Sequence, residues 1–106
     1  MTDIAQLRRA LVARVLDSNG TAPQEQRRAA FDNAGLDEPM RTLIEKVAHH
    51  ADEVTDDDVA AVRAAGLSED QIFEIVVCAA VGQANRQYDS ALAALAAATG
   101  ETGDRR

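Results

Sequence analysis

The segment from Ser68 to about Ala98 constrains the fold most, because it lacks proline and has the pattern of one long helix. Ser68 and Gln71 have the spacing of a capping box, and Gly100 suits the helix end. Two apolar stripes run along this segment. The first is Ile72, Ile75, Val76 and Ala79, and the second is Phe73, Val77, Val81, Ala84, Tyr88 and Leu95. A helix with two stripes is buried from several sides over its first half.

Shorter helices are predicted before this segment. The chain has 106 residues with 22 alanines, six glycines and two prolines, a composition that favours an all-α fold. We expect five helices in one domain over residues 1–99, followed by a disordered tail at 100–106. The four predicted upstream helices run from about Asp3 to Asp17, from Thr21 to about Asn33, from Asp37 through Ala51, and from Thr55 to about Ala65. Thr55 is the expected cap of the last of these, with Asp58 three residues after it.

The apolar spacing of the upstream helices predicts which faces are buried. In the first helix, a single stripe combines Ile4, Leu7, Leu11 and Val15. The second helix, with a capping-box spacing from Thr21 to Gln24, is mostly polar and is expected on the surface. The third presents a clean apolar face, with the adjacent histidines His49 and His50 pointing about 100° apart.

Charge and cysteine content exclude several classes of function. The formal net charge of −7 disfavours non-specific binding to nucleic acid, which needs clustered cations. One cysteine, Cys78, provides neither an internal disulfide nor a zinc or dithiol centre. The acidic run from Asp52 to Asp58 lacks the spacing of a calcium loop, and no nucleotide-binding motif occurs. We therefore expect an acidic cytoplasmic protein without metal, cofactor, signal peptide or membrane span.

The second stripe of the long helix predicts self-association. Four short helices cannot cover both stripes, and the second stripe outlasts the first by about two turns. The expected oligomer interface is Phe73, Val77, Val81, Ala84 and Tyr88. A charge in its middle, Val77→Asp, should then break the oligomer or unfold the chain, whereas Glu74→Lys on a more polar flank should do much less.

The stretch from Ile44 to Leu95 resembles the C-terminal half of the alkylhydroperoxidase D-like and carboxymuconolactone decarboxylase superfamily. The residues that carry this resemblance are the runs VTDDDV at 54–59 and VRAAGLSEDQI at 62–72, the apolar 75–77, and Asn85-Arg86. The resemblance implies an orthogonal, all-α fold of the alkylhydroperoxidase D-like type that forms homo-oligomers through the long helix.

The chain departs from this family where the redox chemistry would lie. Redox-active members carry Cys-x-x-Cys with Glu and His on an upstream helix, but residues 21–37 contain neither Cys nor His. Dithiol peroxidase chemistry is therefore not expected, and no upstream His matches the catalytic position of the decarboxylases.

Three residues are the candidates for catalysis. His50 lies at the edge of the predicted core, where an imidazole could serve as acid or base near neutral pH. Glu74 and Arg86 could assist it, although an Arg beside a core more commonly pairs with an acidic residue. His49 is expected in solvent, and Cys78 is expected to be a small buried apolar residue.

Two functions follow as hypotheses. The first is a non-redox homo-oligomer that binds a small molecule or a partner protein. The alternative is a carboxymuconolactone decarboxylase-like enzyme that uses His50 with Glu74 or Arg86. A buried His50 with a shifted pKa that faces a cavity would favour the enzyme, whereas a solvated His50 and no cavity would favour the binding or structural role.

Overall fold

The computed structural model describes residues 2–17 and 19–100, which form helices and no strand. Of the tail predicted at 100–106, Gly100 is described and residues 101–106 lie outside these ranges. The elements are α1 (Thr2–Asp17), α2 (Gln24–Asp32), α3 (Met40–His49), the short 3-10 helix η1 (Ala51–Glu53), α4 (Asp56–Ala64) and α5 (Glu69–Thr99). The all-α class and the five α-helices predicted from the sequence are therefore confirmed.

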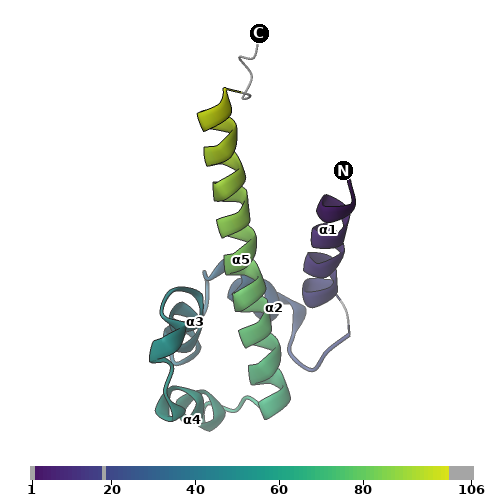
Figure 1. Cartoon of the computed structure of the whole chain (residues 1–106). Coiled ribbons are helices and arrows are strands. Elements are labelled where there is room, and N and C mark those ends of the chain that lie inside the picture. Colours follow the sequence, from purple (N-terminus) through teal and green to yellow (C-terminus); the bar gives the residue numbers. More distant parts are fainter. Residues whose placement is uncertain (1, 18, 101–106) are drawn as a thin grey trace.

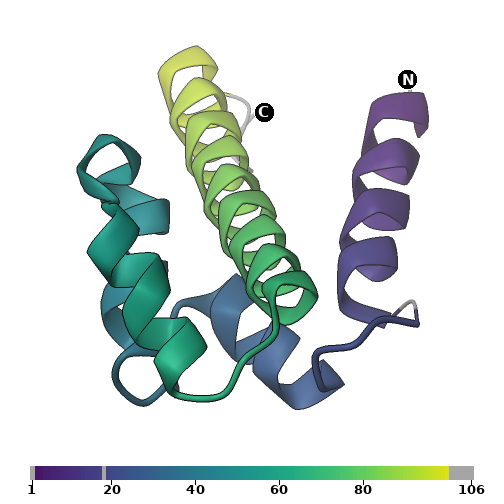
Figure 2. The ribbon, with the colours of Figure 1, turned by 90° about the horizontal axis from the view of Figure 1, so that it is seen from below.

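Helix α5 is the element around which the others are arranged (Figure 1). Helices α3 and α4 lie on one side of it and α1 lies on the other, while α2 crosses its first half, behind it in the view of Figure 1 (Figures 1 and 2). The last third of α5 projects beyond the other helices, which gives the molecule extents of 57 × 29 × 21 Å.

Side-chain capping begins both C-terminal helices as the sequence predicts. The Thr55 hydroxyl accepts from the backbone N–H of Asp58, and the Asp58 carboxylate accepts in return from the Thr55 backbone. Ser68 and Gln71 form the same reciprocal pair at the start of α5. Gly100 ends α5 in the left-handed conformation, with φ of 75°.

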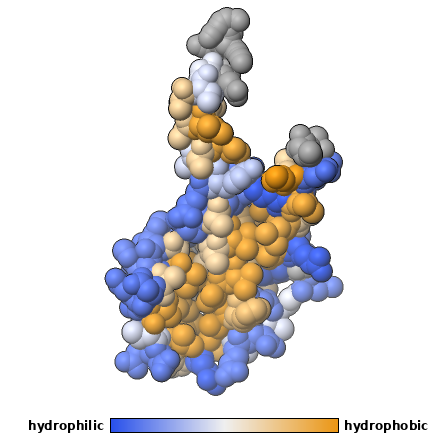
Figure 3. Space-filling view, in the orientation of Figure 1, coloured by the Kyte–Doolittle hydropathy of each residue, from blue (hydrophilic) through white to orange (hydrophobic). Residues whose placement is uncertain are grey.

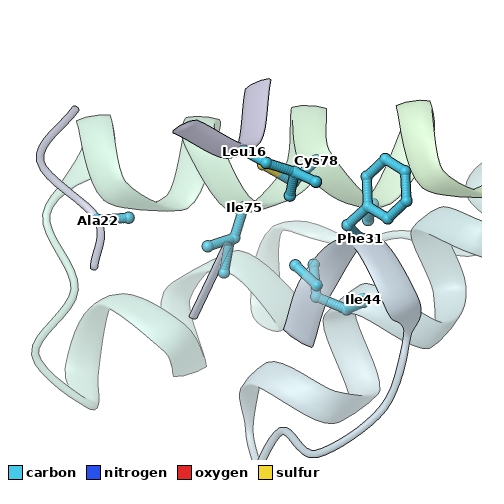
Figure 4. Packing of buried hydrophobic residues seen from close by; sticks show 8 residues of the cluster. Leu16, Ala22, Phe31, Ile44, Ile75 and Cys78 are labelled. Carbon is cyan, nitrogen blue, oxygen red and sulfur yellow. The ribbon is translucent and has the colours of Figure 1, made fainter. Parts of the chain in front are cut away.

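The main core cluster lies where α1, α2 and α3 meet the first half of α5 (Figure 4). Ile44 and Ile75 are fully buried there, and Phe31 reaches the cluster from the end of α2. A second cluster joins α3, α4 and α5 through Leu43, Val62 and Ile72. An ion pair of 2.9 Å between Lys46 and Asp58 also joins α3 to α4, and the Lys46 ammonium holds the pKa of the Asp58 carboxyl below its ordinary value.

Two predictions about α2 were wrong. The helix is not confined to the surface, because Arg27, Ala30 and Phe31 are buried against its neighbours. It begins at Gln24 after Pro23, and the Thr21 hydroxyl donates to Glu74 instead of capping the helix. The helix ends at Asn33, which has the left-handed conformation with φ of 53°.

The predicted apolar stripe of α1 is divided in the structure. Leu16 is buried, and Val12 and Val15 pack against the core. Leu7 and Leu11 are 69 % and 48 % exposed, and Ile4 is exposed as well. Helix α1 therefore contributes mainly its C-terminal half to the core and leaves much of its apolar surface uncovered.

Candidate functional site

Glu74 on α5 binds the segment that leads into α2. Its carboxylate accepts hydrogen bonds from the backbone N–H groups of Thr21 and Ala22, at 2.9 and 2.8 Å, and from the Thr21 hydroxyl at 2.9 Å. Burial raises the pKa of this carboxyl, but the three hydrogen bonds and the nearby charge of Arg27 outweigh that effect, so the pKa lies below its ordinary value. Glu74 is thus an ionised anchor.

Arg86 lies twelve residues further along α5 and binds the opposite end of α2. Its guanidinium donates to the backbone carbonyl of Phe31 at 2.6 Å and to the Gln83 side chain at 2.9 Å. The partner of Arg86 is therefore a backbone carbonyl at the end of a helix instead of the carboxylate expected from the sequence. A carboxylate near the start of α2 and a cation at its end both complement the helix dipole.

His50 does not lie at the edge of the core as predicted. Helix α3 ends at His49, and His50 follows it with φ of −146°, so the helical position assigned to its side chain does not apply. His50 is exposed, as is His49. It does not line the cavity that Glu74 borders. The structure therefore does not bring His50, Glu74 and Arg86 together around one reacting group.

The cavity beside Glu74 has a volume of about 250 Å³ and lies between α1, α2 and α5. Phe73, Val77 and Val15 supply apolar walls, and Arg14 and Arg27 supply guanidinium groups. Arg27 is only 7 % exposed and donates to the backbone carbonyls of Ala22 and Val15, both at 3.2 Å. Sequence reasoning missed Arg27, because nothing in its local spacing separates it from the adjacent Arg28.

Cys78 also lines this cavity and belongs to the main core cluster, where it lies next to Leu16 (Figure 4). Its thiol is 1 % exposed and lies 3.4 Å from the Val15 carbonyl oxygen. Burial raises the pKa of the Cys78 thiol, against a smaller lowering effect from the charge of Arg27. The prediction of a buried cysteine is confirmed.

Arg8 joins α1 to α5 and was also missed. Its guanidinium donates to Asn85 at 2.9 Å, pairs with Asp89 at 2.7 Å, and lies 4.6 Å from the centre of the Tyr88 ring. Asn85 and Tyr88, two residues of α5 noted in the sequence, are thus held by a cation from the other end of the chain.

The predicted interface stripe of α5 is uncovered along much of its length. Phe73 and Tyr88 are 68 % and 38 % exposed, Ala84 is exposed, and Val77 and Val81 are half-buried. Apolar side chains of α1 extend the same face, as the orange surface over α1 and α5 shows in Figure 3. An apolar hollow of about 380 Å³ lies between the two helices, and its lining includes Leu11, Val81, Ala84 and Tyr88.

In the described part of the chain, no group of three or more His, Cys, Asp or Glu side chains is arranged to hold a metal ion. Among the same residues, no helix is both long and apolar enough to cross a membrane. No protein-family model, curated protein or solved structure matches the chain.

Proposed function

We propose that the chain is a non-redox, homo-oligomeric protein of the alkylhydroperoxidase D-like type, which acts by binding a small molecule or a partner. The observation that carries this proposal is the uncovered apolar stripe of α5, with Phe73 and Leu95 at least 60 % exposed. Large contiguous apolar surfaces on small proteins mark interaction sites. Cys78, which is buried and forms no disulfide, supports a role without dithiol chemistry.

Sedimentation velocity of the full chain at micromolar concentration tests the self-association. The wild type is expected to sediment as an oligomer, and Ala84→Asp is expected to sediment as a monomer, because it places a charge in the stripe. Ala61→Asp is the matched control, since Ala61 is also an exposed helical alanine but lies on α4. A monomeric wild type, or equal effects of the two variants, would contradict the proposal.

Native mass spectrometry of the protein as purified tests the binding role. A retained small molecule or partner gives a native mass above a whole multiple of the subunit mass found under denaturing conditions. The cavity of about 250 Å³ beside Arg27 is the expected place for a small molecule, since it combines apolar walls with charged groups. A native mass equal to a whole multiple in every preparation counts against the binding role.

A further inference from the structure

The projecting end of α5 has an unusual sequence for a helix in water. Residues 90–99 read SALAALAAAT and contain no charged side chain, although nine of these ten residues are exposed. Surface helices ordinarily carry charged residues on the side that faces solvent. Nothing in the described part of the chain covers this segment, which extends beyond the other helices (Figure 1). Its composition suits packing against another protein surface.

The two ends of the apolar stripe of α5 lie at equal distances from Ala84. Phe73 precedes Ala84 by eleven residues and Leu95 follows it by eleven, and these are the most exposed large apolar residues of the helix, at 68 % and 60 %. A small residue at the centre lets two helices approach closely, and large residues toward the ends fill the space as the helices diverge. This arrangement is self-complementary when two copies of α5 run antiparallel, because Phe73 of each then faces Leu95 of the other.

An apolar hollow lies at the position where that arrangement would place the projecting end. It has a volume of about 280 Å³ and is lined by Val59 of α4 and by Ile72, Phe73 and Val76 of α5. The two charged residues at its rim, Arg63 and Glu69, pair with each other at 3.1 Å. The hollow therefore offers apolar walls and a locally neutralised rim to an uncharged helix.

We propose that two copies of the chain pair through antiparallel α5 helices that cross at Ala84, so that residues 90–99 of each copy pack on the Val59–Phe73–Val76 hollow of the other. This inference rests on the self-association proposed above and specifies its partner, direction and register. The occupant is a second copy because the projecting end and the hollow belong to the same chain and lie at similar distances from Ala84, on opposite sides of it along α5.

The surface available is close to what a stable dimer needs. A standard interface buries roughly 800 Å² on each partner. The large apolar residues of this face together expose on the order of 400 Å², if a whole aromatic side chain has 150–250 Å². These residues are Phe73, Tyr88, Leu92 and Leu95. Further apolar area comes from the alanines of 90–99, from the half-buried Val77 and Val81, and from Leu11, which lines a hollow with Ala84.

Disulfide crosslinking tests the register. In a Cys78→Ser background, Ala84→Cys is expected to crosslink to itself under mild oxidation, because the two copies of this position meet at the symmetry axis. Phe73→Cys alone and Leu95→Cys alone are expected to remain uncrosslinked, since in each case the paired positions lie about 33 Å apart at 1.5 Å per residue. A mixture of these two variants is expected to form the heterodimeric crosslink.

The outcomes separate this inference from the proposed function. Efficient self-crosslinking of Phe73→Cys or Leu95→Cys within an oligomer would show parallel or shifted pairing, which overturns the inference and leaves the self-association standing. A monomeric wild type in sedimentation overturns both. All three positions are exposed, so the cysteines do not disturb the core. Distances between spin labels on the two copies provide a second measurement. The inference requires a short distance for labels at position 84 and long distances for labels at 73 or at 95.

Discussion

Gly82 of α5 lies against the backbone carbonyl of Phe31 at the end of α2, so closely that a Cβ atom on Gly82 would overlap the carbonyl oxygen and lie 2.7 Å from the carbonyl carbon. The obstacle is backbone, which cannot move aside by changing a rotamer. Gly82 is therefore required for the close crossing of α2 and α5, and the same crossing brings the Phe31 carbonyl within reach of Arg86.

Gly82→Ala is expected to destabilise the protein by about 1–3 kcal/mol, the usual cost of overpacking. Helix propensity alone predicts the opposite sign, because Ala stabilises a helix interior by about 0.5–1 kcal/mol relative to Gly. Urea unfolding at matched protein concentration measures the difference. Gln87→Ala on the exposed surface of the same helix serves as the control, and it is expected to change the stability by less than about 0.5 kcal/mol. A stabilised Gly82→Ala variant would contradict the close crossing.

Glu74→Gln is expected to destabilise the protein by about 1–2 kcal/mol at neutral pH, because one amide oxygen replaces a carboxylate that accepts three hydrogen bonds. Glu69→Gln is the matched control, since Glu69 forms an exposed ion pair with Arg63 and its loss costs little. For the same reason, Glu74→Lys is not the mild variant expected from the sequence: it removes the anchor of α2. Equal unfolding midpoints for the two Gln variants would contradict the role of Glu74.

The lowered pKa of Glu74 also predicts a pH dependence. The native state binds this proton more weakly than the unfolded state does, so the stabilisation is complete above the ordinary value of 4.5 and is lost as the pH falls through the native pKa. Glu74→Gln should therefore lose less stability on acidification than the wild type loses. Unfolding midpoints from about pH 6 to about pH 3 measure this difference, and parallel curves would contradict it.

Cys78 is expected to react slowly with iodoacetamide in the native protein and rapidly in urea, because the thiol is buried and its pKa is raised. An added cysteine at exposed Ala61, in a Cys78→Ser background, is the control and should react rapidly without urea.

Peroxide turnover with thiol reductants should be absent in the wild type. Turnover that Cys78→Ser abolishes would overturn the non-redox assignment.

His49→Ala and His50→Ala are both expected to change stability by less than about 0.5 kcal/mol, as exposed side chains usually do. Ile44→Ala on the same helix is the positive control and should cost about 2–5 kcal/mol, since Ile44 is fully buried. Thermal unfolding of the three variants measures these effects. A loss of stability in His50→Ala but not in His49→Ala would instead support the sequence-based prediction that His50 lies at the edge of the core.

Local signals in the sequence predicted the elements well where a side chain caps its own helix. Two helix starts were predicted correctly from capping boxes, Thr55 with Asp58 and Ser68 with Gln71. The hydrogen bonds of each box join residues within four positions of one another, so the local sequence determines them. The same spacing misled at Thr21, where a distant carboxylate, Glu74, takes the hydroxyl and backbone groups. A capping box and a tertiary anchor compete for the same atoms, and only the fold decides between them.

The candidate site was harder to predict because its contacts are long-range and involve backbone. Arg86 binds a carbonyl 55 residues away, and Arg8 binds Asp89 across 81 residues. Periodicity assigns a face to a residue only while the helix continues, so His50 was misplaced once α3 ended at His49. Cys78 was predicted correctly because burial in an apolar helix depends on its immediate neighbours.

The attachment of α2 at both of its ends has a consequence for amide hydrogen exchange. A nine-residue helix is marginal alone, so α2 persists because α5 holds it through Glu74 and Arg86. Its amides should therefore exchange only when the first half of α5 also opens, and the two segments should share one opening free energy. Helix α1, in which Leu16 is the buried large side chain, is expected to open separately and earlier. The order of exchange in the native protein thus follows the contacts of α5 rather than the order of the chain.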